Sequence, residues 1–248
     1  MAEIPGDHPR HDSLVTRHRI EEGVKTGITS KQGLIAQGRG EAFDYLLGER
    51  TIKSADMAAR VAAAHLLSAR YPVLSVNGNV AALCPAEMVD LAHTVGADLE
   101  VNLFGRTDER VRAIAEHLRE HGAHEVKGLT GDARIPNISH ERAKVDSDGI
   151  YAADVVLVPL EDGDRADALG EMNKIEIVID LNPLSRSAQV ATVPIVDNII
   201  RAVPNIASHA RDLRESETDL DAVVSEFDPK TTLSDAERVI RSPTDDSS

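Results

Sequence analysis

Four stretches of this 248-residue sequence place polar side chains directly after apolar runs that have the composition of buried strands. They are NGN at 77–79, EDGDR at 161–165, NPLSRS at 182–187 and DN at 197–198. In open sheets flanked by helices, ligands bind at the carboxyl ends of parallel strands. Turns favour the same residue types, which is the ordinary explanation for any one stretch. We call the residues that directly follow a strand the exit of that strand. Four polar exits together predict a polar ligand site along one edge of the sheet.

Arginines beside these stretches suggest that the ligand carries phosphate. Arg39 stands between two glycines in GLIAQGRGEAFDYLLGER (33–50), and a helix is expected to begin after Gly40. Arg186 likewise lies at an expected loop-to-helix junction, and helix N-termini and arginines both bind phosphate. A surface ion pair is the alternative for either side chain. The sequence has no P-loop motif, and GRGEAF has only the first two glycines of a dinucleotide fingerprint.

A polar stretch at 130–149 is long for a connection inside a compact domain, and such loops are often functional or mobile. It contains His140, Glu141 and Arg142, followed by Lys144. This cluster predicts either a lid that binds an anionic substrate or a mobile charged loop.

The other histidines give no metal-site pattern. His117, His121 and His124 lie on or beside a charged helix, and no H-E-x-x-H motif occurs. We interpret them as a solvated face, and the metal ligands, if the chain has any, stay unknown. Cys84 is the only cysteine, which excludes an intramolecular disulfide and a zinc ribbon.

The net charge disfavours some classes of binding partner. The formal net charge is -15, so the surface is expected to repel nucleic acid and anionic membranes. The cations comprise 20 Arg and 7 Lys, and this scarcity of Lys in an acidic chain predicts adaptation to high salt. No apolar run approaches the ~20 residues of a membrane span, and the polar start has no secretion signal. A cytoplasmic location is expected.

Periodicity predicts the elements that must position these groups. Helices are expected at 13–27, after Gly40, and at 54–70, 85–96, 107–123 and 197–213, with Ser54 as a cap and Pro204 as a kink or break. Strands are expected at 72–79, 98–104, 124–129, 153–160, 174–181 and 191–196. This alternation predicts an α/β fold with a mostly parallel, doubly wound sheet.

The chain is expected to divide into a domain at 1–213, which includes the N-terminal helices, and a tail at 214–248. The tail is acidic and weakly apolar. Two short helices and a disordered end are expected there.

Several long blocks of the sequence resemble one family. They are IPGDHPR (4–10), GLIAQGRGEAFDYLLGE (33–49), SVNGNVAAL (75–83), HERAKV (140–145), ADVVLVPLEDGDR (153–165), IDLNPLSRSA (179–188) and IVDNIIRA (195–202). Together they resemble the archaeal phosphopantothenate synthetases, the 4-phosphopantoate–β-alanine ligases. The resemblance covers residues 4 to about 205 and leaves out the acidic tail.

The resemblance implies a Rossmann-like homodimer that joins 4-phosphopantoate to β-alanine in coenzyme A biosynthesis. ATP would be cleaved to AMP and pyrophosphate through an acyl adenylate, with Mg²⁺ accompanying the triphosphate. The family's ATP-binding positions match Arg17, Arg39, Asp180, Leu181, Asn182, Arg186, Ser187, Asp197 and Asn198.

Two further assignments are hypotheses from the residues. Asn77, Asn79 and Arg142 are candidates for binding phosphopantoate, and His140 or Glu141 for accepting a proton from the β-alanine ammonium. A nucleotide-sensing module without turnover is the alternative function. An oxidoreductase with a nicotinamide cofactor is disfavoured by the missing glycine fingerprint.

Overall fold

The computed structural model describes residues 5–8, 10–160 and 163–242. Its main sheet contains β1 (Pro72–Val76), β2 (Asp98–Val101), β3 (Val126–Lys127), β6 (Val155–Pro159), β7 (Ile175–Ile179) and β8 (Val193–Ile195). The spatial order is β3-β2-β1-β6-β7-β8, and every neighbouring pair is parallel. This is the doubly wound, Rossmann-like order, so the predicted fold class is confirmed.

The two faces of the sheet carry different layers. The larger core packs α3 (Lys53–Ser68), α5 (Pro85–Val95), α6 (Asp108–Glu120) and α9 (Ile199–Glu215) on one face. On the other face lie α7 (Gly163–Glu171) and the segment that contains β4 (Ala133–Arg134), η1 (Glu141–Ala143) and β5 (Lys144–Val145). Val73 faces the smaller core and Leu74 the larger one, as alternation along a strand requires. Parallel strands covered on both faces have nearly continuous apolar sequences, which is why β1, β6, β7 and β8 were predictable.

The segment 130–149 is more ordered than a charged loop. β4 and β5 pair antiparallel, with Ala133 opposite Val145. Ile135, Ala143 and Val145 are almost fully buried against the sheet. The segment therefore forms part of the molecule's second core.

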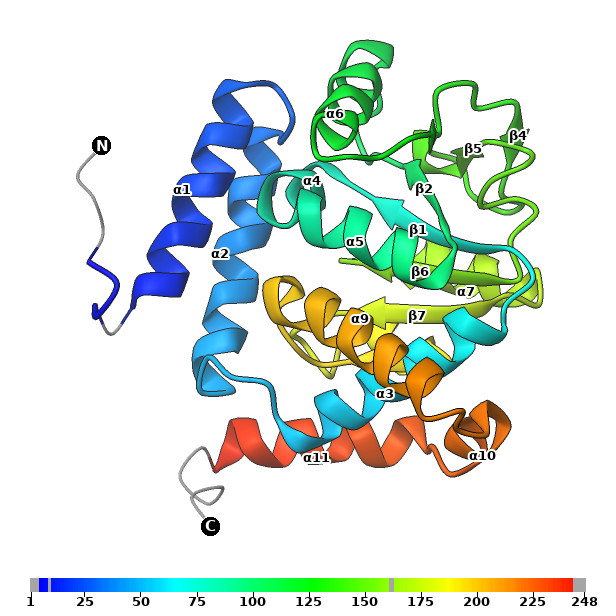
Figure 1. Ribbon diagram of the computed structural model, residues 1–248. Coiled ribbons are helices and arrows are strands. Elements are labelled where there is room, and N and C mark those ends of the chain that lie inside the picture. Colours follow the sequence, from blue (N-terminus) through cyan, green and yellow to red (C-terminus); the bar gives the residue numbers. More distant parts are fainter. Residues whose placement is uncertain (1–4, 9, 161–162, 243–248) are drawn as a thin grey trace.

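Helices α1 (His11–Lys25) and α2 (Lys31–Leu46) lie side by side at the end of the sheet toward which the strands point (Figure 1). The prediction that a helix begins after Gly40 was wrong, because α2 already includes Gly33, Gly38 and Gly40. Arg39 therefore lies inside a helix and not at a junction. Close packing explains one of these glycines: a β-carbon at Gly33 would collide with Asn79 and Thr29, whereas one at Gly40 would make an ordinary contact, 3.4 Å from Leu181.

Two other helix predictions also need correction. Helix α3 begins at Lys53 with Ile52 as its N-cap, so Ser54 does not cap it. Helix α9 runs through Pro204, so of the predicted kink or break only the break is wrong. Its packing against α3 and α5 buries Val203, Ile206 and Ala207, which offsets the hydrogen bond that proline removes.

Three short helices complete the body and the tail: α4 (Gly78–Leu83), α8 (Arg186–Val190) and α10 (Leu220–Ser225). The last helix, α11 (Pro229–Arg241), packs against α3 and buries Leu233 and Ala236. The two predicted tail helices are confirmed, and the end predicted to be disordered (243–248) lies outside the described residues. Cys84, between α4 and α5, is buried.

Candidate functional site

Helix α2 lies across the carboxyl ends of three of the parallel strands. After β1, Asn79 Nδ2 donates a hydrogen bond to the Gly33 carbonyl oxygen over 3.0 Å. After β7, Leu181 packs against the α2 backbone at Gly40. After β8, Asn198 Nδ2 donates to the buried carboxylate of Asp44 over 2.7 Å. The polar strand exits therefore meet beneath one helix.

A cavity of about 380 Å³ opens between the first half of α2 and the exits of β1, β2 and β6. Its lining combines polar amides, two arginines and an apolar wall: Ser30, Gln32, Gly33, Ala36, Asn77, Gly78, Asn79, Leu103, Phe104, Gly105, Arg110, Arg142 and Leu160. The three residues predicted for phosphopantoate, Asn77, Asn79 and Arg142, are thus brought together at one cavity. Glu161 and Asp162, from the next strand exit, lie outside the described residues.

The two asparagines build the wall of this cavity. Asn77 is the N-cap of α4: its Oδ1 accepts hydrogen bonds from the backbone N–H groups of Asn79 and Val80 at 3.0 and 3.1 Å. Its Nδ2 donates to the Pro159 carbonyl oxygen over 3.0 Å, which links the exits of β1 and β6. Helix capping and a hydrogen bond between two strand exits therefore fix the side chain of Asn77 in the cavity wall.

Two arginines make the cavity receptive to an anion. Arg142 is almost fully buried in η1. Arg110, near the start of α6, donates to the carbonyl oxygens of Gly105 and Ile28 at 2.8 and 3.2 Å. Burial lowers the pKa of Arg110, but a guanidinium stays protonated in proteins. Arg110 was not predicted because it belongs to an amphipathic helix; its closeness in sequence to the end of β2 was the available signal.

His140 lies beside the cavity, with its ring 5.7 Å from the ring of Phe104, which lines it. Its Nε2 is 3.0 Å from Asp164 Oδ2. Burial alone would raise the pKa of Asp164, but the interaction with His140 and the backbone N–H groups of Asp164 and Arg165 together lower it. Glu141 is exposed and paired with Lys144 at 2.7 Å. Histidine and aspartate therefore form a dyad beside the cavity, whereas Glu141 is engaged elsewhere.

Asp180, Asn182 and Ser187 form one turn after β7. Asp180 Oδ1 accepts a hydrogen bond from the Asn182 backbone N–H at 3.0 Å, and its Oδ2 accepts one from Ser187 Oγ at 3.3 Å. Leu181 is buried beneath α2, whereas Arg186 is exposed at the start of α8 and pairs with Asp167. The predicted junction position of Arg186 is thus confirmed.

Asp197 and Asn198 belong to a buried network after β8. Asp197 accepts hydrogen bonds from Thr51 Oγ1 at 2.6 Å and from Arg201 Nε at 2.9 Å. Arg201 also pairs with Asp44 on α2 at 2.5 Å. Burial raises the pKa of Asp197, and the adjacent Arg201 opposes that rise. Arg201 was not predicted; it lies in the first turn of α9, four residues after Asp197, which precedes the helix, and this spacing was the signal in the sequence.

Arg17 and Arg39 lie on opposite flanks of α2. Arg17, on α1, pairs with Glu41 of α2 through two hydrogen bonds of 2.8 and 2.5 Å. Arg39 is two residues earlier on α2, a rotation of ~200° on a helix, and is exposed. It makes no side-chain hydrogen bond or ion pair with any part of the chain that the structure describes. Of the predicted ATP positions, Leu181, Asp197 and Asn198 line a cavity of only about 20 Å³ beneath the middle of α2. Arg186 instead lies beside α7, where it pairs with Asp167.

Known proteins share this sequence over nearly its whole length. Residues 54–243 match the phosphopantothenate/pantothenate synthetase family. A 4-phosphopantoate–beta-alanine ligase of Thermococcus kodakarensis is 55% identical over 95% of this chain and 91% of its own. One of Methanosarcina mazei is 56% identical over 95% and 93%, and one of Methanospirillum hungatei 54% over 86% and 87%. The chain belongs to the phosphopantothenate/pantothenate synthetase family.

Proposed function

We propose that the protein is an ATP-dependent ligase that joins 4-phosphopantoate and β-alanine to give 4'-phosphopantothenate in coenzyme A biosynthesis. The observation that carries the proposal is its identity of 54–56% to proteins with that ligase name. The cavity with two arginines at the carboxyl edge of the sheet supports it, because the acid substrate is a phosphorylated anion.

The reaction proceeds in two steps. The phosphopantoate carboxylate attacks the α-phosphorus of ATP, and pyrophosphate leaves. The β-alanine amine then attacks the acyl adenylate, and AMP leaves. Both steps bring anions together, so arginines offset the repulsion and orientation supplies much of the rate.

The two substrates occupy adjoining parts of the edge. Arg110 and Arg142 bind phosphopantoate in the larger cavity, with Asn77 and Asn79 in its wall. ATP binds beside the middle of α2, at Arg17, Arg39, Asp180, Leu181, Asn182, Arg186, Ser187, Asp197 and Asn198. For Asp197 and Asn198, which are buried under α2, the contact requires that the helix shift when the nucleotide enters.

His140 accepts the proton that the β-alanine ammonium must lose. Its contact with Asp164 orients the ring, and its place beside Phe104 brings it close to the cavity. Glu141 is the weaker candidate because Lys144 holds it at the surface. His140→Ala is expected to lower kcat at least 100-fold; an unchanged kcat would exclude the histidine as the base.

Mg²⁺ accompanies ATP. The described residues contain no group of three or more His, Cys, Asp or Glu side chains able to hold a metal. Mg²⁺ that accompanies a nucleotide is bound mainly by phosphate oxygens and water, with one or two carboxylates. Asp180 is the carboxylate best placed to contribute. The ion would neutralise charge on the triphosphate.

The chain acts as a homodimer that joins through the outer face of α2. Leu34, Ile35, Tyr45 and Leu46 on this helix are 40%, 75%, 70% and 39% exposed. Contiguous apolar exposure of this kind marks interaction surfaces. No described helix has the length and apolar character needed to cross a bilayer, and we place the enzyme in the cytoplasm.

The test is AMP formation from ATP in KCl and Mg²⁺, with 4-phosphopantoate and β-alanine supplied together or singly. AMP and 4'-phosphopantothenate formed in equal amounts, only when both are present, are expected. Tight ATP binding without AMP under any condition would overturn the ligase and favour a nucleotide sensor.

A further inference from the structure

The carboxylate of Glu41 is held by two arginines. Arg17 donates to both of its oxygens, and Arg10 Nη2 donates to Oε1 over 2.9 Å, the same oxygen that accepts from Arg17 Nη2. Only 15% of the Glu41 side chain is exposed. The hydrogen bond from Arg17 lowers the pKa of Glu41, so the carboxylate stays charged at neutral pH.

This cluster has one positive charge in excess. Two guanidinium groups share a single carboxylate, in a chain whose net charge is -15. A guanidinium has five N–H donors, and Glu41 takes only one edge of Arg17 and one nitrogen of Arg10. The two arginine side chains remain 45% and 47% exposed. Their outer N–H groups are therefore available to a second anion.

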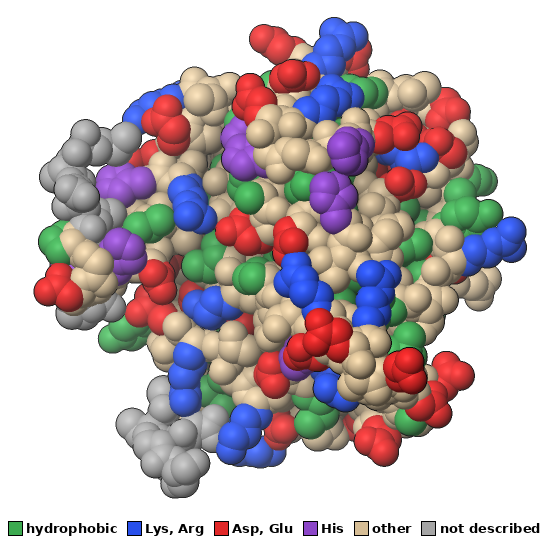
Figure 2. All heavy atoms as spheres, in the orientation of Figure 1, with side chains coloured by type: hydrophobic (Ala, Val, Ile, Leu, Met, Phe, Trp, Pro, Cys, Tyr) green, Lys and Arg blue, Asp and Glu red, His purple; other side chains and the backbone are tan. Residues whose placement is uncertain are grey.

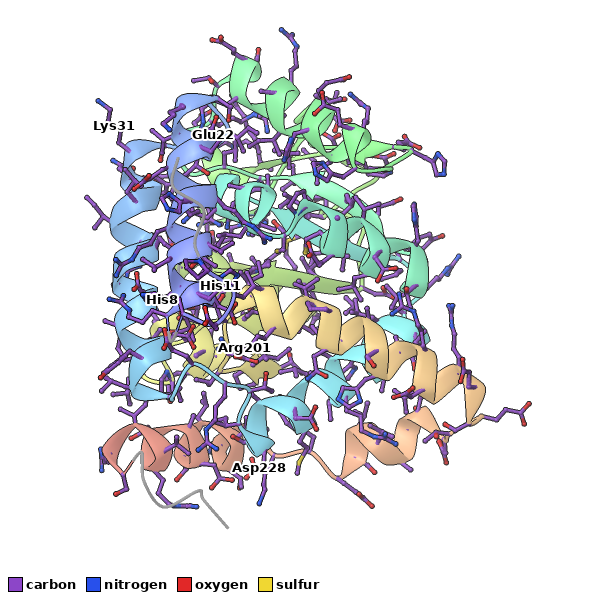
Figure 3. The ribbon with its side chains drawn as sticks, turned by 60° about the vertical axis from the view of Figure 1, so that its left-hand side comes forward. His8, His11, Glu22, Lys31, Arg201 and Asp228 are labelled. Atoms are coloured by element: carbon purple, nitrogen blue, oxygen red, sulfur yellow. The ribbon has the colours of Figure 1, made fainter. Side chains whose placement is uncertain are left out.

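Arg10 is fixed in this place by the segment before α1. Its backbone N–H donates to His8 Nδ1 over 3.0 Å, and the backbone N–H of His11 donates to the His8 carbonyl oxygen over 2.9 Å. His11 Nδ1 is also 3.0 Å from the Pro5 carbonyl oxygen. Figure 3 shows His8 and His11 where this segment meets α1, on the side of the molecule that α1 and α2 form.

Glu41 also links the cluster to the expected nucleotide site. It lines the small cavity beneath α2 together with Asp197 and Asn198. Arg17 is one of the positions that the resemblance assigns to ATP, whereas no role has been given to Arg10 or Glu41. Arg10 therefore reaches the same carboxylate as an expected ATP ligand.

We propose that Arg10 is a further phosphate-binding arginine of the nucleotide site, and that Glu41 is a positioning residue that holds Arg10 and Arg17 with their outer edges toward the phosphates. The inference rests on the proposed function. The carboxylate occupies the inner edge of the guanidinium fork, and phosphate oxygens accept from the outer edge. A purely structural tie between α1 and α2 is the alternative, and it would affect every ligand equally.

The test compares ATP with adenosine, which lacks the phosphates, by equilibrium binding. In Arg10→Ala, the Kd for ATP is expected to rise roughly 10- to 100-fold while the Kd for adenosine changes less than about 2-fold. Arg10→Lys should recover part of the loss, since it restores the charge without the fork. Lys25→Ala is the matched control: Lys25 is another α1 cation, paired with Glu22 at 3.2 Å, and its loss should change neither Kd.

Glu41→Gln tests the positioning role. The expected result is a higher KM for ATP with the KM for β-alanine unchanged. Equal losses for ATP and adenosine in Arg10→Ala, or no loss for either, would overturn the inference. Turnover by the wild type decides the ligase assignment separately: a chain that binds ATP through Arg10 but forms no AMP would keep this inference and lose that one.

Discussion

At the scale of single residues, the buried carboxyl group of Glu100 makes the stability of the folded chain depend on pH. It lies on β2 with none of its surface exposed, and it accepts hydrogen bonds from the backbone N–H groups of Asp146 at 3.1 Å and Ile150 at 2.5 Å. Burial raises the pKa of this carboxyl to about 7, although the two N–H groups favour the charged form. One carboxyl group thus ties the segment after β5 to the sheet.

Glu100 should make the folded state less stable as the pH rises. Between its ordinary pKa of 4.5 and about 7, the folded chain keeps a proton that the unfolded chain releases. Stability is therefore lost across this window, by up to about 3 kcal/mol at roughly 1.4 kcal/mol per pKa unit. Glu100→Gln cannot ionise, so its free energy of unfolding relative to wild type should increase from pH 5 to pH 8.

Urea unfolding at the two pH values measures this difference. Asp148→Asn is the control, because that carboxylate is exposed. A difference between Glu100→Gln and wild type that stays constant with pH would mean that Glu100 titrates near its ordinary value.

At the scale of elements, the position of α2 depends on one close approach, at Gly33. A side chain at Gly33 would collide with Asn79 and Thr29, whereas one at Gly38 would meet no atom within 4 Å. Both glycines lie in the same helix, so they form a matched pair.

Gly33→Ala should destabilise the fold and move the start of α2 away from the cavity, which raises the KM for phosphopantoate. Gly38→Ala should instead stabilise by roughly 0.5–1 kcal/mol, because alanine favours helix and nothing opposes it. Thermal unfolding and steady-state kinetics of the two variants provide the measurement. A stabilised Gly33→Ala variant would show that the contact with Asn79 is not tight.

The same helix shows where sequence reasoning succeeds and fails. The six strands and the long amphipathic helices were predictable, since local apolar periodicity determines them. The start of α2 was not, because glycines lower helix propensity locally, and the close approach of Gly33 to Asn79 and Thr29 is a tertiary contact. α4 was also missed, because its six residues are too few to show a period.

In the candidate site, too, some residues could be predicted from the sequence and others could not. Polar residues at strand exits could be found, because parallel strands end on one edge. Arg110 and Arg201 could not, since each acts through a tertiary contact with a segment distant in sequence: Arg110 with Ile28, and Arg201 with Asp44.

At the scale of the whole molecule, the exposed face of α2 should hold two copies together. Ile35→Glu would bury a charge in that interface, so it should convert the dimer to a monomer in light scattering. Tyr71→Glu is the control, because this exposed tyrosine lies at the opposite, amino-terminal edge of β1. A wild-type chain that is already monomeric would exclude the dimer.

At the same scale, the net charge determines how the thermal stability of the protein depends on salt. Figure 2 shows acidic and basic side chains interspersed on one face, so the excess of -15 is not confined to a single patch there. Salt shortens the range of repulsion from about 10 Å at 0.1 M to 3 Å at 1 M. The Tm at pH 7 should therefore rise with KCl, and the rise should shrink near pH 5.0, the isoelectric point of the sequence. A Tm that is independent of salt at pH 7 would contradict adaptation to high salt.

The reactivity of the single cysteine, Cys84, which is buried, can be used to follow motion in the folded protein. Burial raises the pKa of the Cys84 thiol, so the reactive thiolate is scarce in the folded chain. The preceding residue, Leu83, accepts a hydrogen bond from Arg19 of α1 through its carbonyl oxygen at 2.7 Å. A thiol reagent added to the native protein will therefore record how often α1 and the α4–α5 junction separate. Any cysteine introduced at the surface can be labelled against almost no background.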